Sequence, residues 1–354
     1  MKNGKLQVAI IGTGGIAESV HVPGYLALAQ EVDVAAACDT RPAALAAFAT
    51  QFGIPHTFTD YQQLLESDLG LDAVSICTPP STHLPIATAA LAAGLHVMLE
   101  KPVARTAAEA RGIVDAARRS GRKLMIGFQY RFSWHTQALK RIIVSGELGE
   151  IYYTRALAIR RRGIPGWGVF TSKELSGGGP LMDLGVHVLD QAIYLLGAPR
   201  AVSVFGNVFQ KLGTRPGPNS FGPWDPTRFE TEDFASGQVR FANGSLLLLE
   251  TSWALNTTRE GFNVQVMGTR GGAECDPLSV NRELAGLLMD LTPVLPDSPS
   301  DGQREKIAHF VRCILDDTPP LVTFDEILLV ASILDGIYRS AETGHSVALD
   351  SPAS

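Results

Sequence analysis

The first 128 residues alternate between short apolar runs and longer Ala-rich stretches. The apolar runs contain almost no interleaved polar residues, which is typical of parallel strands covered on both faces. We expect these runs to be strands at 6–11, 32–38, 72–77, 95–99 and 123–128. We expect the Ala-rich stretches to be helices near 16–29, 42–52, 83–93 and 106–119. The alternation predicts a doubly wound parallel sheet in an α/β domain over 1–128.

The pattern changes after residue 128. The expected elements are helices near 134–145 and 181–196, strands at 150–160, 238–241 and 245–253, and closing helices near 302–315 and 324–342. Asn243-Gly244 between two strands is a strong hairpin signal, because both central residues of such a turn take positive φ. Hairpins imply antiparallel pairing, so we expect an α+β domain over 129–354.

Length and composition narrow the function classes. A chain of 354 residues suits two domains, and the formal charge of −6 argues against nucleic-acid binding. The four cysteines, Cys38, Cys77, Cys275 and Cys313, show neither a disulfide framework nor zinc-ligand spacing. No apolar segment reaches the roughly 20 residues that span a bilayer, and 6–11 is too short for a signal-peptide core, so we expect a cytoplasmic protein. The Pro- and Gly-rich stretches 212–228 and 289–302 are interpreted as surface loops or subunit contacts.

The run Gly12-Thr13-Gly14-Gly15-Ile16-Ala17 matches the G-x-G-x-x-G/A pattern between the first strand and the first helix. The first glycine makes the tight turn, the second lets the backbone approach a pyrophosphate, and the small third residue lets helix and strand pack. A helix N-terminus there offers N–H groups to the phosphates. The alternative is a glycine-rich turn without a ligand, but the surrounding strand and helix favour a dinucleotide site.

Asp39 ends the second strand, 22 residues after Ala17. A carboxylate at this position accepts the ribose hydroxyls of NAD and repels the additional phosphate of NADP. Arg41 leaves NADP possible, because an arginine there accommodates a 2′-phosphate. We favour NAD.

Two segments follow later strands, at the sheet edge where ligands of α/β proteins bind. Thr78-Pro79-Pro80-Ser81-Thr82-His83 follows the fourth strand, and Glu100-Lys101-Pro102 follows the fifth. A lysine beside a nicotinamide can hydrogen-bond a reacting hydroxyl and assist its proton loss. From its position alone, Lys101 is equally well explained as a surface ammonium.

The glycine-rich run from Gly177 to Gly179 opens the helix that carries Asp183 and His187. These two residues have i, i+4 spacing and so share a helical face. Histidine is suited to moving a hydroxyl proton, and Asp183 either orients it or binds a substrate hydroxyl. Two alternatives remain. In the first, the carboxylate favours the helix N-terminus and His187 is a buried structural residue; in the second, His187 and Asp190 hold a metal. We expect no metal.

In combination and in order, these motifs resemble the glucose–fructose oxidoreductase / inositol dehydrogenase (Gfo/Idh/MocA) family. The resemblance extends through Glu232-Asp233-Phe234, Asn243-Gly244 and Ser340-Ala341-Glu342, so it covers essentially the whole chain. It implies a Rossmann domain followed by a domain with a large open-faced sheet, which commonly forms the subunit interface. It also implies an NAD(P)-dependent oxidoreductase that acts on a secondary hydroxyl of a sugar, cyclitol or sugar derivative.

The resemblance also implies residue roles. Lys101 would contact the nicotinamide ribose and the substrate, Asp183 and His187 would meet the substrate hydroxyl, and His187 would be the acid/base. Pro79 and His83 would line the cofactor side. The full set of expected cofactor contacts is Gly12, Thr13, Gly14, Gly15, Ile16, Asp39, Arg41, Thr78, Pro79, His83, Glu100, Lys101 and Gln129.

Further residues are candidates for choosing the substrate. Arg131 follows the sixth strand, and Arg160 begins an arginine run that precedes Trp167. Trp167 suits stacking on a pyranose face and an arginine suits a hydroxyl or carboxylate. The alternatives are loop packing for Trp167, and a solvated strand end or interface for two of the three arginines.

Three functions are compatible with these residues. We expect a homo-oligomeric dehydrogenase of an uncharged sugar or cyclitol, although a sugar acid or nucleotide sugar is also compatible. A redox-assisted lyase, epimerase or glycosidase would use the same lysine and histidine but release no reduced nicotinamide. A non-catalytic NAD-binding regulator is disfavoured by the joint presence of Lys101, Asp183 and His187.

Overall fold

The computed structural model describes residues 1–2, 4–294 and 300–349. The chain divides into two units. The first contains Met1–Ala104, Ala108–Gln129 and Gly302–Phe324; the second contains Arg105–Ala107, Tyr130–Asp301 and the residues from Asp325 onward. The domain boundary after residue 128 stays a prediction, while Gly302–Phe324 joins the first unit although it follows the second in sequence.

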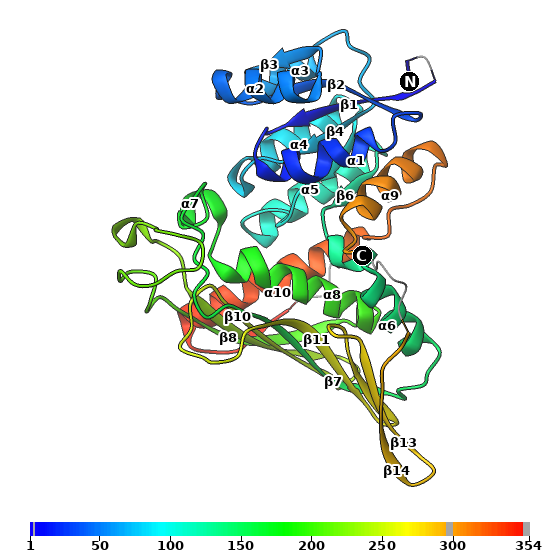
Figure 1. The fold of residues 1–354 in the computed structure, drawn as a ribbon, viewed down its shortest axis with the longest axis vertical. Helices are drawn as coiled ribbons and strands as arrows, with labels where there is room; N and C mark the ends of the chain where they lie inside the picture. Colours follow the sequence, from blue (N-terminus) through cyan, green and yellow to red (C-terminus); the bar gives the residue numbers. More distant parts are fainter. Residues whose placement is uncertain (3, 295–299, 350–354) are drawn as a thin grey trace. The chain divides into compact units, whose positions relative to one another are not determined.

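The apolar runs of the first unit form a parallel sheet with the order β3-β2-β1-β4-β5-β6 (Figure 1). The strands are β1 (Leu6–Ile11), β2 (Val32–Cys38), β3 (His56–Phe58), β4 (Ala73–Ile76), β5 (His96–Leu99) and β6 (Leu124–Ile126). Every residue of β1, β4 and β6 is buried, as continuous hydrophobicity requires. The order reverses between β1 and β4, which confirms the predicted doubly wound sheet. The edge strand β3 has no apolar run and was not among the predicted strands.

The helices of the first unit follow the predicted pattern closely. They are a π-helical turn (Ala17–His21), α1 (Val22–Leu26), α2 (Pro42–Phe52), α3 (Tyr61–Leu65), a 3₁₀ turn (Pro80–Thr82), α4 (His83–Ala92), α5 (Ala107–Ser120) and α9 (Gln303–Leu315). The helix expected near 16–29 is shorter than predicted and begins with a π-helical turn. The other predicted helices agree to within one residue at each end.

The second unit contains a nine-stranded sheet with the order β14-β13-β12-β11-β7-β10-β9-β8-β15. Its strands are β7 (Ile151–Ile159), β8 (Ala201–Phe209), β9 (Phe234–Phe241), β10 (Leu246–Ser252), β11 (Gly261–Gly268), β12 (Gly271–Glu274), β13 (Ser279–Leu284), β14 (Leu287–Leu291) and β15 (Val347–Ala348). All neighbouring pairs are antiparallel except β7 with β10. Gly244 has φ +85° at the β9–β10 turn, which confirms the predicted hairpin.

Helices lie along one face of this sheet (Figure 1). The helices and helical turns of the unit are a 3₁₀ turn (Gln129–Phe132), α6 (Trp134–Val144), α7 (Lys173–Ser176), a π-helical turn (Leu181–Gly185), α8 (Val186–Leu196), a 3₁₀ turn (Pro226–Arg228) and α10 (Phe324–Thr343). Along β7, Thr154, Ala156 and Ala158 are buried, whereas Arg155 and Leu157 remain partly exposed. The sheet therefore has one covered face and one open face.

The two predicted loops differ in outcome. Residues 212–228 are mostly exposed and lie between β8 and β9, as expected of a surface loop. The predicted loop 289–302 instead begins inside β14, which pairs with β13 through Leu291. Its residues 295–299 lie outside the described residues. No helix in the described part of the chain is long and apolar enough to cross a membrane.

Arg131 is fully buried and joins three helical segments of the second unit. Its Nη2 donates to Asp190 Oδ1 at 2.6 Å, its Nε donates to Asp190 Oδ2 at 2.9 Å, and its Nη1 contacts Glu326 Oε2 at 2.9 Å. The guanidinium also lies 5.2 Å from the ring centre of Tyr194 in α8. This placement corrects the expectation that Arg131 contacts substrate, because the side chain is closed off from solvent and its guanidinium is bound by carboxylates.

We expect Arg131→Met to lower the free energy of unfolding by about 3–5 kcal/mol, because it leaves buried carboxylates without their cation. Arg215→Met removes an exposed arginine of the same unit and should change stability by less than about 0.5 kcal/mol. Urea unfolding of both variants measures the difference. Equal stability of the two would contradict a structural role for the buried cluster.

Candidate active site

The turn after β1 has the geometry that a dinucleotide requires. Gly12 has φ +92°, and a Cβ there would lie 2.8 Å from the carbonyl carbon of Cys77. Only glycine fits that turn. At Gly14 and Gly15 no atom lies within 4 Å of the position a Cβ would take, so this side of the loop is open to a ligand. Ala17 is fully buried, as the small residue of this pattern should be.

Asp39 lies beside this loop, at the carboxyl end of β2. Its Oδ2 accepts hydrogen bonds from the backbone N–H and the hydroxyl of Thr13, both at 2.9 Å. Arg41 donates from Nε to Oδ1 at 3.0 Å and from Nη2 to Oδ2 at 3.1 Å. Burial would raise the pKa of Asp39, but the hydrogen bonds from Arg41 and Thr13 outweigh it and hold the pKa far below its ordinary value. The carboxylate is therefore ionised at any working pH, as an acceptor for ribose hydroxyls must be.

His83 links the segment that follows β4 to the segment that follows β5. Its Nδ1 lies 2.9 Å from the carbonyl oxygen of Pro102, and its Nε2 lies 2.9 Å from that of Thr78. The ring is fully buried, and burial lowers its pKa although the carbonyl contacts oppose this. His83 thus holds the turn after Lys101 against the turn after β4, and its expected place beside the cofactor stays a prediction.

Glu100 lies in a buried network next to Lys101. Its Oε1 accepts hydrogen bonds from His21 Nε2 at 2.9 Å and from Lys306 Nζ at 2.7 Å, and its Oε2 accepts from the backbone N–H of Lys101 at 3.3 Å. Burial would raise the pKa of Glu100, but the charge of Lys306 and the bond from His21 hold it well below its ordinary value. Burial lowers the pKa of His21, and a neutral ring can donate to Glu100 while Nδ1 accepts from Ser75.

Sequence reasoning missed His21 and Lys306. It placed Glu100 among the cofactor contacts, whereas the structure shows its carboxylate fixing the backbone of Lys101. Gly127 makes room for that carboxylate, because a Cβ there would lie 2.6 Å from Oε1. A signal existed for Lys306: helical spacing places it with Phe310 and Cys313 on the buried face of α9.

In the second unit, Asp183 lies in the π-helical turn Leu181–Gly185 and His187 in the first turn of α8. Single π-helical turns occur often at functional sites. Trp253, fully buried just beyond β10, donates from its indole N–H to Asp183 Oδ2 at 3.0 Å. The side chain of Asp183 is thereby held in one orientation.

His187 is 8% exposed and borders aromatic rings. The ring of Tyr130 meets the imidazole edge-on at 5.4 Å, and Tyr130 stacks on Phe262 at 4.8 Å. Burial raises the pKa of Tyr130, so its hydroxyl stays protonated near neutral pH. The imidazole therefore lies in a largely apolar surrounding that limits its access to water.

Glu232 and Tyr338 explain two of the three glycines that precede the turn carrying Asp183. Glu232 Oε1 accepts from the backbone N–H of Leu181 at 3.1 Å and from the hydroxyl of Tyr338 at 2.9 Å. A Cβ at Gly178 would collide with the Tyr338 hydroxyl, and one at Gly179 with the carbonyl oxygen of Glu232. Burial raises the pKa of Glu232. The glycines thus let the chain pack closely against this buried carboxyl group.

The arginines of the run that begins at Arg160 make different contacts. Arg162 donates to the carbonyl oxygen of Leu255 at 3.0 Å and to Asn256 Oδ1 at 2.6 Å, so it fixes a strand end. Arg160 is half-buried; burial lowers its pKa while the charge of Asp183 raises it. Its guanidinium lies 4.9 Å from the ring centre of Phe221. Arg160 is therefore the member of the run whose pKa responds to the charge of Asp183.

A metal at His187 finds no support among the described residues. They contain no group of three or more His, Cys, Asp or Glu side chains placed to hold an ion. Asp190, the second ligand considered, is instead bound to Arg131.

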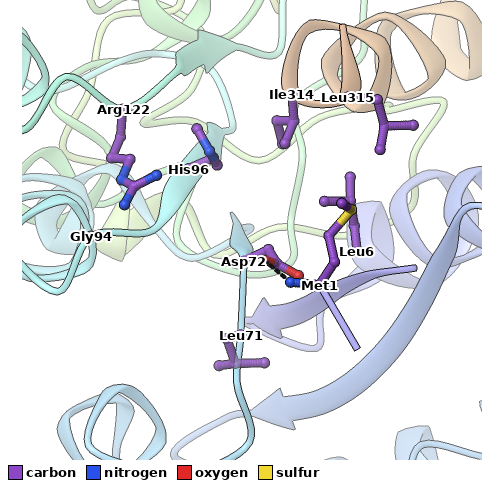
Figure 2. Close-up of a pocket in the computed structure, with 9 residues that line it drawn as sticks. All are labelled: Met1, Leu6, Leu71, Asp72, Gly94, His96, Arg122, Ile314 and Leu315. Carbon is purple, nitrogen blue, oxygen red and sulfur yellow. Dashed lines mark hydrogen bonds and ion pairs between the residues drawn. The ribbon is translucent and has the colours of Figure 1, made fainter. Parts of the chain in front are cut away.

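A cavity of about 230 Å³ lies elsewhere in the first unit (Figure 2). It is lined by Met1, Leu6, Leu71, Asp72, Gly94, His96, Arg122, Ile314 and Leu315. Leu6 begins β1 and His96 begins β5, so the cavity lies at the amino-terminal edge of the parallel sheet. The glycine loop, Asp39 and Lys101 follow the carboxyl ends of the strands. The cavity is therefore separate from the residues predicted to bind the cofactor.

Comparison with known proteins identifies the chain. Residues 6–128 match the model of the "Oxidoreductase family, NAD-binding Rossmann fold" (GFO_IDH_MocA), and residues 136–274 match that of the "GFO/IDH/MocA C-terminal domain". The D-glucoside 3-dehydrogenase of Escherichia coli K12 is 39% identical over 99% of this chain and 99% of its own. The chain belongs to the GFO/IDH/MocA oxidoreductase family.

Two further members show the range of this family. The D-xylose 1-dehydrogenase (NADP⁺) 2 of Haloferax volcanii is 29% identical over 98% of this chain and all of its own. A levoglucosan dehydrogenase solved in complex with NADH and L-sorbose is 25% identical, with a TM-score of 0.84 over 98% of this chain and all of that one. The predicted family, fold and reaction class are confirmed: the chain is an NAD(P)-dependent sugar dehydrogenase that acts on a CH–OH group.

The buried ion pair between Glu100 and Lys306 predicts that loss of the cation destabilises the protein, by an amount that depends on pH. Lys306→Met should lower the free energy of unfolding by about 3–5 kcal/mol, because it leaves the Glu100 carboxylate buried without its cation. Without Lys306, burial raises the folded-state pKa of Glu100 above its unfolded value, so the loss should be larger near pH 8 than near pH 5. Urea unfolding at both pH values measures it.

Two controls accompany this variant. Glu100→Gln combined with Lys306→Met removes both charges and should recover part of the loss. Lys123→Met removes a cation whose partner, Asp317, is 93% exposed, and should cost less than about 1 kcal/mol. A pH-independent loss in Lys306→Met would contradict the buried ion pair.

The contacts of Asp39 predict the cofactor preference. Asp39→Ser should weaken NAD binding about ten- to a hundredfold, because charged hydrogen bonds to ribose are lost. It should also improve use of NADP, since Arg41 is released from its carboxylate partner. The ratio of kcat/KM for the two cofactors measures this. Asp33→Ser, at a surface carboxylate of the same strand, should leave the ratio unchanged; a ratio unchanged in Asp39→Ser would refute the assignment.

Proposed function

We propose that this chain oxidises the hydroxyl at carbon 3 of a D-glucoside, with NAD as the acceptor. The observation that carries the proposal is the 39% identity, over 99% of both chains, to a D-glucoside 3-dehydrogenase. The geometry supports it through Asp183 and His187, which lie together in a water-poor environment of the second unit. An uncharged glucoside needs hydroxyl recognition and a proton acceptor, and these two side chains supply both.

The residues of the first unit fit a dinucleotide. The open side of Gly14 and Gly15 would receive the pyrophosphate, and Asp39 would accept the adenosine ribose hydroxyls. When bound, nicotinamide supplies the hydride acceptor of the reaction. We assign Lys101 to the reacting oxygen, where its ammonium would stabilise negative charge as the hydroxyl loses its proton. Glu100 holds the backbone that carries this lysine.

The residues of the second unit would handle the substrate hydroxyl. We assign His187 as the base that takes the hydroxyl proton. Asp183, held by the indole N–H of Trp253, would orient the hydroxyl or the imidazole. Tyr130 and Phe262 limit water around the imidazole, which strengthens the electrostatic interactions of the site.

We also propose that the protein forms homo-oligomers and is located in the cytoplasm. Phe205, Leu248 and Arg155 form part of one row across the open face of the second sheet, with Phe205 41% exposed. Leu157 lies beside Arg155 on the same face. The same row also contains Gln238 and Gln265, so the face mixes apolar and polar side chains, as subunit interfaces commonly do. Reduced, separate cysteines suit the cytoplasm.

The decisive experiment measures nicotinamide absorbance with a panel of sugars, glucosides and inositols and either cofactor. We expect net reduction of NAD with glucosides and a 3-keto product by NMR. Lys101→Ala should lower kcat by a factor of about 100 or more while NAD binding by calorimetry is retained. A Lys101→Ala enzyme that keeps most of its activity would refute the lysine assignment, and substrate consumption without net NAD reduction would refute the dehydrogenase reaction.

A further inference from the structure

Three aromatic side chains of the second unit lie together near the surface. Trp167 is 54% exposed and Phe221 is 42% exposed. Their ring centres lie 5.4 Å apart, and the ring of Phe170 meets Trp167 edge-on at 6.3 Å. Trp167, Phe170 and Phe221 are called the aromatic platform below. Large apolar rings gathered at the surface typically mark a binding site.

The platform stands on loops that are firmly joined. Asn219 Oδ1 accepts from the backbone N–H of Ile164 at 2.8 Å, and Asn219 Nδ2 donates to the carbonyl oxygen of Ile164 at 2.8 Å. Gly166 approaches Pro223 so closely that a Cβ would collide with the Pro223 carbonyl oxygen. Trp167 and Phe221 therefore stay exposed on a backbone that is held in place, which is how preformed ligand sites present aromatic rings.

Arg160 connects the platform to the proposed reaction site. Its guanidinium lies 4.9 Å from the ring centre of Phe221, and the charge of Asp183 raises its pKa. Phe170 also meets the ring of Trp253 edge-on at 6.3 Å, and Trp253 holds Asp183. The contact through Trp253 places Phe170 of the platform one side chain away from Asp183.

A D-glucoside carries a second group, the aglycone, on the anomeric carbon of the reacting ring. If the reacting ring meets Asp183, the group attached to its anomeric carbon extends over the rings beyond Arg160. Aromatic side chains favour flat apolar partners and the apolar faces of sugars, and they offer few hydrogen bonds to a free anomeric hydroxyl. The rings therefore fit an aglycone rather than the reacting sugar.

We propose that the aromatic platform is an aglycone subsite that selects glucosides carrying an aryl or other flat apolar group over free glucose and methyl glucoside. This inference rests on the proposed function and deepens it. The reacting ring is common to all these substrates, so the subsite changes binding and leaves the chemical step alone.

The test compares phenyl and methyl D-glucosides, each as both anomers, in the wild-type protein and in Trp167→Ala, Phe221→Ala and the double variant. The wild type should prefer the phenyl glucoside, and each single variant should lose about tenfold in kcat/KM for it, mainly through KM. The kcat/KM for methyl glucoside should change less than about twofold. Calorimetric titration of phenyl glucoside with reduced cofactor present, which blocks turnover, should show the same loss of affinity.

The matched control is Tyr152→Ala, which removes a ring that is also 54% exposed but lies at the start of β7. It should leave both substrates unaffected. Equal losses for phenyl and methyl glucosides, or an unchanged preference in the double variant, would overturn the subsite. A change in sedimentation mass in Trp167→Ala would also overturn it, because the rings would then be a subunit contact. If neither glucoside is oxidised by the wild type, the proposed function fails instead.

Discussion

The buried carboxylate of Glu100 is the constraint on which the first unit depends. A carboxylate removed from water is tolerated only where a cation and hydrogen bonds replace its hydration. Lys306 supplies the cation, His21 supplies a neutral donor, and Gly127 supplies the space. The same carboxylate accepts from the backbone of Lys101. One electrostatic requirement therefore joins β5, the first helical turns and α9 around the residue assigned to the reaction.

The second unit also contains a buried carboxyl group, and hydrogen bonds hold it in place. Glu232, buried and bonded to Leu181 and Tyr338, fixes the backbone that leads to Asp183. Trp253 then fixes the carboxylate itself. Arg131 binds Asp190 four residues before Tyr194 on the same helix, so α8 is held at several points along its length. The proposed site residues thus stand on backbone fixed by buried polar groups.

Much of this arrangement is readable from local sequence. Continuous hydrophobicity predicted the strands, the G-x-G-x-x-A run predicted the turn after β1, and Asn243-Gly244 predicted the hairpin, because each signal lies within a few residues of the structure it produces. Arg131 shows the limit: its position after a strand suggested a ligand contact, whereas its partners come from α8 and α10. Lys306 pairs with a residue 206 positions away. Neither partnership has a local signature, since ion pairs leave no periodicity in sequence.

The return of α9 to the first unit also bears on how the protein is made. As the chain leaves the ribosome, residues 1–128 emerge with Glu100, yet the ammonium of Lys306 that neutralises it appears only after eight of the nine strands of the second sheet, β7 to β14, have been synthesised. Until then the nascent Rossmann unit lacks the helix that packs against α1 and the counter-charge of Glu100. The first unit therefore cannot be completed until residues 130–301 of the second unit have been synthesised.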